Sequence, residues 1–301
     1  MFLINSIKIK VNSGGNLSVL RLGDGDYYFL RQIPLGSAKP GRRALTKSYE
    51  NLPMSIFLKR MWQNDFICPE VTPHNYKMWH GYVFYEFFDK ILDEFKINFQ
   101  NNKTAAPVKV VFDKIFGWLI SRPVWLRIFV WLVSLRKKGG YYQKAISLVN
   151  KTYMPMEVIY ALVSTKLIFR NYPDKIALIG AKEKLDVIKE LVKKEEYKKY
   201  LGIEKFVDYI DVPQVGAADN IDELVKNTGM QVAKSSARIF LVAAGSAKLG
   251  FLSELKEYKD AIYIDIGCGM DALAGIVCQD RPYFASWVNY RLKAYDYGKV
   301  D

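Results

Sequence analysis

A recurring order of apolar run, glycine and helix-forming segment is the feature that most limits what this chain can fold into. The apolar runs lie at 18–22, 175–179, 207–212, 238–244 and 261–266. Helical periodicity fills the segments 182–200, 219–236 and 246–258. Continuous apolar strands separated by helices indicate a mostly parallel sheet with both faces covered. We therefore expect an α/β fold, a Rossmann-like parallel sheet with helices on both faces and a helical insertion.

Several of these runs end in a glycine that is followed by a helix. In open α/β sheets such strand ends bind ligands, and phosphates favour the start of a helix. Gly180 ends one run, and Gly245 ends another. Ser246 supplies a hydroxyl at the following helix start, and Lys248 lies in its first turn. These residues predict a cradle for a diphosphate, although the spacing of a P-loop is absent.

Two carboxylates, Asp24 and Asp26, follow the first apolar run and are separated by glycine. Two such close carboxylates repel one another unless a cation lies between them, and Mg²⁺ or Mn²⁺ suits that position. Gly23 and Gly25 allow the backbone to approach a ligand. A simple Gly-Asp hairpin turn is the alternative. Arg21 argues against that turn, because a cation inside an apolar strand needs a carboxylate or phosphate partner.

A glycine-rich motif, DIGCGMD, begins at Asp265. It resembles the first motif of methyltransferases that use S-adenosylmethionine. Met270 and Asp271 stand where those enzymes have a third glycine, and the chain ends soon afterwards. An ordinary methyltransferase places most of its sheet after this motif. A methyltransferase of permuted strand order is therefore kept as an alternative function.

Taken together, the motifs resemble the GT-D-fold glycosyltransferases. RLGDGD at 21–26 resembles that family's R-x-G-D-G-E motif, and the runs ending at Gly245 and Gly267 resemble two of its later strands. The likeness covers about 15–60 and 170–280. The resemblance implies a metal-dependent enzyme that moves a sugar from a nucleotide-diphosphate sugar, most often a UDP-sugar. The acceptor would be a glycan or a lipid-diphosphate-linked molecule.

The resemblance also implies roles for single residues. Asp24 and Asp26 would bind Mn²⁺ or Mg²⁺ and the diphosphate, although Asp26 replaces the family's glutamate. Lys248 would neutralise the departing diphosphate. Asp271 or Glu183 would act as the base at the acceptor hydroxyl. The residues assigned to the nucleotide-sugar are Arg21, Gly23, Gly25, Gly180, Gly245, Ser246, Lys248, Asp265 and Gly267.

The net charge of +13 predicts an anionic partner, and residues 103–144 carry nine Lys or Arg against one acid. The apolar, Trp-rich stretch 104–140 is no membrane span, because Arg122 and Arg127 would each cost about 2.5–3.5 kcal/mol. It resembles instead an amphipathic helical insertion that lies on an anionic membrane surface through 108–138. Solvated core helices are the alternative. We do not expect nucleic-acid binding, because no recognition motif accompanies the charge.

Composition places further limits on the chain. An apolar content of 50% excludes a disordered protein, so we expect one domain over 1–301 that contains the insertion. The start lacks the features of a signal peptide, and three cysteines do not form a disulfide framework. We therefore expect a cytoplasmic protein, peripheral on the cytoplasmic face of a membrane. The spacing of Cys68, His74 and His80 does not fit a zinc site.

Overall fold

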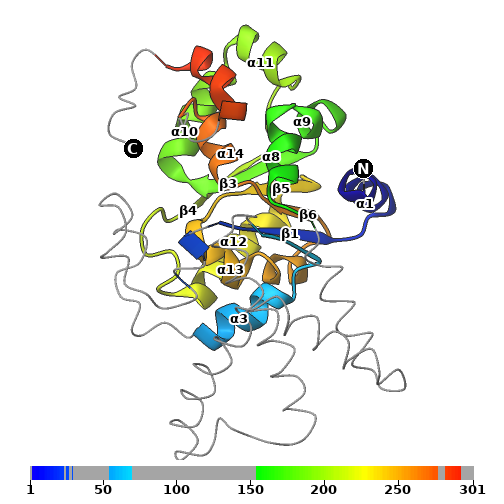
Figure 1. The fold of residues 1–301 in the computed structure, drawn as a ribbon, viewed down its shortest axis with the longest axis vertical. Helices are drawn as coiled ribbons and strands as arrows, with labels where there is room; N and C mark the ends of the chain where they lie inside the picture. Colours follow the sequence, from blue (N-terminus) through cyan, green and yellow to red (C-terminus); the bar gives the residue numbers. More distant parts are fainter. Residues whose placement is uncertain are drawn as a thin grey trace, which may run out of the picture. The chain divides into compact units, whose positions relative to one another are not determined.

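A computed structural model describes residues 2–23, 25–26, 29, 54–69, 154–276 and 282–292. The chain divides into two compact units, one formed by Met1–Cys68 with Met156–Asp301 and the other by Pro69–Pro155. The first unit holds the sheet, with its helices and strands labelled in Figure 1. The expected insertion at 104–140, and with it the proposed membrane contact at 108–138, lies outside the described residues.

The described residues form one six-stranded sheet with the strand order β2-β1-β6-β5-β3-β4. Its strands are β1 (Leu17–Leu22), β2 (Phe66–Pro69), β3 (Ile176–Ala181), β4 (Tyr209–Val212), β5 (Ile239–Val242) and β6 (Ile262–Asp265). The pairs β1–β6, β6–β5, β5–β3 and β3–β4 are parallel. The expected α/β fold is confirmed, and β2 is a strand that the sequence analysis missed.

Burial explains why the central strands read as unbroken apolar runs. Every residue of β3, β5 and β6 is buried, because helices cover both faces of the sheet. The edge strand β4 instead alternates between buried and more exposed residues. β2 escaped notice because its four residues, FICP, are too few to show a period.

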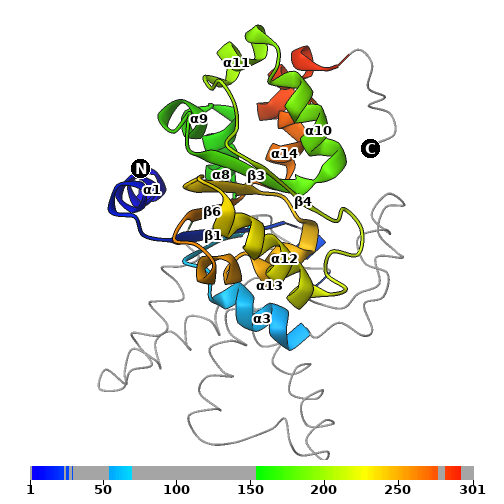
Figure 2. The same cartoon turned by 180° about the vertical axis from the view of Figure 1, so that it is seen from behind.

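Helices lie on both faces of the sheet, as the two opposite views in Figures 1 and 2 show. One face carries α8 (Glu157–Ser164), α10 (Lys182–Leu191) and α14 (Cys268–Leu273). The other carries α3 (Met54–Trp62), α12 (Ile221–Lys234) and α13 (Lys248–Phe251). The remaining helical segments are α1 (Phe2–Ser13), α9 (Leu167–Asn171), α11 (Glu195–Leu201), η3 (Gly245–Ala247), η4 (Glu254–Glu257) and η5 (Pro282–Tyr290). None of the helices in the described part of the chain has the length and apolarity needed to cross a membrane.

Two of the expected helices are interrupted. The chain turns after α10, so the segment 182–200 forms two helices, α10 and α11. This turn lets Tyr197 become buried and donate a hydrogen bond of 2.5 Å to the Leu273 carbonyl. The segment 246–258 is built from η3, α13 and η4 rather than one helix. Within this segment α13 packs closely against α3, since a β-carbon at Gly250 would lie 2.7 Å from the Phe57 ring.

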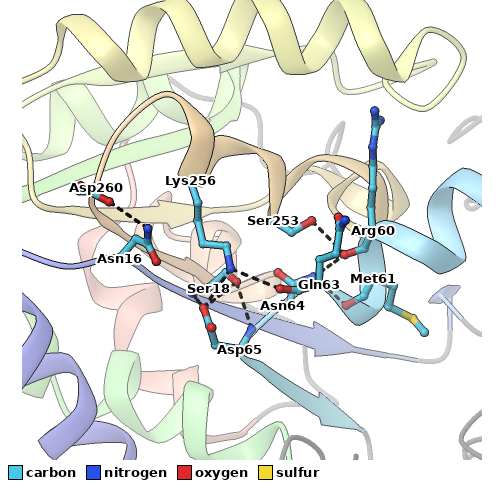
Figure 3. A network of polar contacts seen from close by, with 10 residues as sticks. All are labelled: Asn16, Ser18, Arg60, Met61, Gln63, Asn64, Asp65, Ser253, Lys256 and Asp260. Carbon is cyan, nitrogen blue, oxygen red and sulfur yellow. Dashed lines mark hydrogen bonds and ion pairs between the residues drawn. The ribbon is translucent and has the colours of Figure 1, made fainter.

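A polar network joins the amino ends of β1 and β2 to the segment around η4 (Figure 3). The Asp65 carboxylate accepts hydrogen bonds from the Ser18 amide at 2.8 Å and from the Ser18 hydroxyl at 3.2 Å. Lys256 Nζ lies 3.2 Å from the same oxygen. The Asn64 amide caps α3 by donating to the Met61 carbonyl at 2.9 Å. Because β2 is so short, this network holds its start against β1.

Replacing the centre of the network should weaken the fold. In Asp65→Ala, the Ser18 amide and hydroxyl lose a charged acceptor, so we expect unfolding free energy to fall by about 1–2 kcal/mol. Urea denaturation of the purified variant measures this loss. The control is Asp260→Ala, which removes one exposed hydrogen bond from Asn16. Equal stability of the two variants would contradict a structural role for the Asp65 network.

Candidate functional site

Four charged side chains meet beyond the carboxyl ends of β1, β5 and β6: Arg21, Asp26, Lys248 and Asp265. After β5 the chain enters α13 on one face of the sheet, and after β6 it enters α14 on the other (Figure 1). Ligands of open α/β sheets bind where neighbouring strands send their connections to opposite faces. The four side chains, called here the charged cluster, therefore occupy the place where this fold offers a site.

Lys248 bridges the two carboxylates of the charged cluster. Its Nζ lies 2.9 Å from Asp26 Oδ2 and 2.7 Å from Asp265 Oδ2. The exposed fractions of these side chains are 2% for Lys248, 6% for Asp26 and 0% for Asp265. Buried charges are tolerated only when they are paired, so Lys248 allows two carboxylates to remain under the surface.

Backbone groups complete the pairing. The Gly23 amide donates to Asp26 Oδ2 at 2.8 Å, and the Gly267 amide donates to Asp265 Oδ1 at 3.0 Å. Gly245 has φ of +52°, and its turn into η3 brings Lys248 to the first position of α13. Ser246 is buried within η3. The sequence analysis assigned these strand ends to a ligand's phosphates, and in the structure their side chains and backbone amides contact one another.

Arg21 lies in a slot formed by two glycines and an aromatic ring. A β-carbon at Gly23 would stand 2.7 Å from Arg21 Nη1, and one at Gly267 would collide with Arg21 Nη2. The Arg21 Cζ lies 5.6 Å from the centre of the Tyr160 ring. Gly267 also has φ of +47°, which disfavours any side chain there. These two glycines, expected to admit a ligand, make room for Arg21.

The Arg21 guanidinium is positively charged. Burial is the strongest single effect and acts to lower its pKa, but the electrostatic interactions with Asp265, Tyr160, Cys268 and Asp26 together outweigh burial, so the pKa of Arg21 is raised. Cys68 at the end of β2 shows the opposite chemistry. Burial raises the pKa of the Cys68 thiol to about 12, and the charge of Asp265 adds to this effect. Cys68 is therefore a neutral thiol beside the charged cluster.

Tyr160 and Cys268 are neighbours of the cluster that sequence reasoning missed. The Tyr160 hydroxyl lies 3.0 Å from Cys268 Sγ. Cys268 begins α14 directly after Gly267 and is partly exposed. Tyr160 belongs to α8, more than a hundred residues earlier in the chain. Nothing in the local sequence around Tyr160 marks it as part of a site.

Other expected site residues lie elsewhere. Gly180 supports packing of α14, since a β-carbon there would touch Met270 Cε at 3.4 Å. Asp271 forms an ion pair with Lys184 between α14 and α10, with the two side chains 31% and 21% exposed. The structure does not bring Asp271 into the charged cluster. Among the described residues, a β-carbon at Gly25 would meet nothing within 4 Å.

The metal site predicted at Asp24 and Asp26 is described only in part. Asp24 lies outside the described residues. Within the described ranges, no group of three or more His, Cys, Asp or Glu side chains could hold a metal ion. Asp26 Oδ1 receives no hydrogen bond from any described residue, because Gly23 and Lys248 both contact Oδ2. Carboxylate oxygens are ligands that hard divalent cations prefer.

The alternative methyltransferase motif has a structural explanation. Gly267 borders the Arg21 guanidinium, and Gly269 packs closely on Ile266, where a β-carbon would lie 3.2 Å from its side chain. Met270, which replaces the third glycine, is fully buried. The glycines of this motif thus accommodate the protein's own side chains, which removes the reason to expect a cofactor over them.

Comparison with known proteins gives a limited result. No protein-family model matches the chain, and no solved structure matches it. The chain is similar to the phosphoglycolate phosphatase of Methanobrevibacter smithii, with 28% identity over 152 residues. The matched region covers 49% of this chain and 59% of the relative. The chain thus spans less than two thirds of the curated relative that it matches.

This similarity contradicts the predicted glycosyltransferase activity. The similar protein is named as a phosphatase, which is a hydrolase and not a sugar transferase. The expectation failed for a chemical reason: both classes place carboxylates and cations around phosphate oxygens at a strand end. The RLGDGD motif by itself therefore does not distinguish the two classes. The resemblance of that motif to the GT-D-fold family stays untested.

Removing the bridging cation should destabilise the fold strongly. In Lys248→Met two buried carboxylates lose their shared partner, and we expect unfolding free energy to fall by about 3–5 kcal/mol. Lys184→Met is the matched control, since it breaks an ion pair whose members are both partly exposed. That control should lose less than about 1 kcal/mol. Guanidinium denaturation compares the two, and similar losses would contradict a buried bridge.

The two described cysteines should differ in reactivity. Because the pKa of Cys68 is raised to about 12 by burial, its thiol should resist iodoacetamide at pH 8 in the folded protein. The partly exposed Cys268 should be labelled first. Mass spectrometry of peptides from a Cys278→Ser background follows each site. Labelling of Cys68 at the rate of Cys268 would show that the end of β2 is open to solvent.

Proposed function

We propose that this chain is a phosphatase that releases inorganic phosphate from a small organic phosphate ester. The observation that carries the proposal is the buried bridge from Lys248 to Asp26 and Asp265 at the carboxyl ends of the central strands. The similarity to a protein named phosphoglycolate phosphatase supports the same reaction class. Hydrolysis of a phosphate ester is therefore the chemistry we assign to the charged cluster.

The charges of the cluster suit a phosphoryl group. A phosphate ester brings negative charge that must be neutralised as its P–O bond breaks. Lys248 and Arg21 supply two cations within a mostly buried environment, where electrostatic interactions are stronger than in water. The carboxylates of Asp26 and Asp265 hold Lys248 in place before the substrate arrives, so the cation needs no rearrangement.

We propose a divalent cation as the cofactor of this reaction. Asp26 Oδ1 and the carboxylate of Asp24 would hold Mg²⁺ or Mn²⁺. The metal would supply further positive charge to the phosphoryl oxygens. Asp26 Oδ2 would remain bound to Lys248 and to the Gly23 amide, as it is now. The contacts of Oδ2 thereby orient the Asp26 side chain and leave Oδ1 to bind the cation.

The overall reaction also requires a group that transfers a proton. Water adds its oxygen to phosphorus, the ester P–O bond breaks, and the departing alcohol takes up a proton. A carboxylate near the phosphoryl group is suited to moving that proton. Asp265 does not meet this requirement, since it is fully buried and both of its oxygens are hydrogen-bonded. Asp26 would use Oδ1 for the metal and Oδ2 for Lys248 and the Gly23 amide, so we assign the proton transfer to neither acid.

The activity test is direct. The wild-type protein with Mg²⁺ should release inorganic phosphate from phosphoglycolate or from p-nitrophenyl phosphate, and EDTA should abolish the release. Asp26→Asn keeps the shape of the side chain but removes its charge, so we expect kcat to fall at least about 100-fold. Colorimetric phosphate determination measures both rates.

The control for this experiment is Asp271→Asn. Asp271 pairs with Lys184 outside the charged cluster, so its rate should stay within about threefold of wild type. Absence of phosphate release by the wild type from a panel of phosphate esters would refute the proposed function. A rate for Asp26→Asn equal to that of the control would refute the assigned site.

A further inference from the structure

Arg21 is a nearly buried cation whose hydrogen-bonding capacity is mostly unused. Its side chain is 11% exposed, and a guanidinium carries five N–H donors. Among the described residues, its side chain donates only to Met156 Sδ, a weak acceptor at 3.8 Å. The buried Nε atom has no hydrogen-bond partner there. Leaving such donors unsatisfied is costly, so an acceptor of suitable shape would bind favourably.

Of the described acids, neither Asp265 nor Asp26 supplies that acceptor. Asp265 Oδ2 lies 3.7 Å from Arg21 Nε, beyond hydrogen-bonding distance, but only 2.7 Å from Lys248 Nζ. Asp26 is likewise bound to Lys248, at 2.9 Å. Lys248 therefore takes the close contacts with both acids, and the positive charge of Arg21 is the less neutralised of the two.

The surroundings of Arg21 fix its guanidinium plane. The Tyr160 ring lies 5.6 Å from its Cζ, in a cation–π contact. Gly23 and Gly267 border the two terminal nitrogens, where any larger residue would displace them. A planar fork held in this way matches the paired oxygens of a phosphate or a carboxylate. A flexible lysine could not be oriented by the same slot.

We propose that Arg21, held between Gly23, Gly267 and Tyr160, forms an oxyanion-binding subsite. An anionic group of the substrate binds there to the Arg21 guanidinium. The inference rests on the proposed function for its substrate class, a phosphate ester. The binding itself can be measured without turnover. In this subsite Arg21 contacts the ligand directly, whereas Lys248 remains the partner of the two carboxylates.

The first test uses wild-type protein labelled with ¹⁵N-arginine. Arg21→Lys identifies the Arg21 Nε–Hε resonance in the NMR spectrum by its loss. Titration with inorganic phosphate should shift this resonance to saturation, and titration with oxalate tests whether a carboxylate serves as well. A shift with either anion supports the subsite and identifies the accepted group. No shift with either would overturn the proposal.

Affinity measurements provide the second test. Calorimetry should show phosphate binding at least tenfold weaker in Arg21→Met, with partial recovery in Arg21→Lys. The matched control is Arg238→Lys, which changes another arginine with a buried, unpartnered Nη2 among the described residues. Arg238 precedes β5, at the opposite end of the strand from the cluster. Unchanged phosphate affinity in folded Arg21→Met would overturn the proposal.

The two proposals can fail separately. Phosphate binding that depends on Arg21, in a protein that hydrolyses no ester, supports the subsite and refutes the phosphatase. Hydrolysis of phosphoglycolate with the same KM in wild type and Arg21→Lys supports the phosphatase and refutes the subsite. A KM increase in Arg21→Lys with little change in kcat is the result expected if both hold.

Discussion

The contact of Lys248 with Asp26 and Asp265 is the interaction on which the site depends. Without a shared cation, two carboxylates could not remain buried at the ends of neighbouring strands. The bridge also couples three parts of the chain, since Asp26 follows β1, Lys248 begins α13, and Asp265 ends β6. It thereby positions the loops beyond these strands before any ligand is present.

Arg21 explains glycines in two motifs that lie far apart in the sequence. Gly23 and Gly267 belong to different strand ends, yet both border the same guanidinium. Glycine at a strand end is commonly interpreted as space for a ligand. Here the space is first occupied by a side chain of the protein, and a ligand would meet that side chain and not the bare backbone. The distinction changes which substitutions should affect binding.

The assignment of the enzyme class shows what a short motif can and cannot determine. RLGDGD indicated acids, a cation and phosphate at the end of the first core strand, and the structure brings Arg21 and Asp26 to that position. The same groups serve sugar transfer from a diphosphate and hydrolysis of a phosphate ester. The motif therefore could not choose between them, and the similarity to a protein named as a phosphatase contradicts the first.

The sequence by itself determined the parallel α/β fold, because buried central strands must be continuously apolar and these runs lie between helices. It also predicted the edge of the sheet at which the charged cluster lies, because the carboxyl ends of parallel strands share one edge. Only the tertiary structure decided the pairings: the Arg21 amide donates to Asp265 across 244 positions, and Asp271 turns away to Lys184. The short strand β2 and the breaks within the helices were likewise decided by packing. Such contacts depend on how distant segments meet, which local periodicity and spacing do not encode.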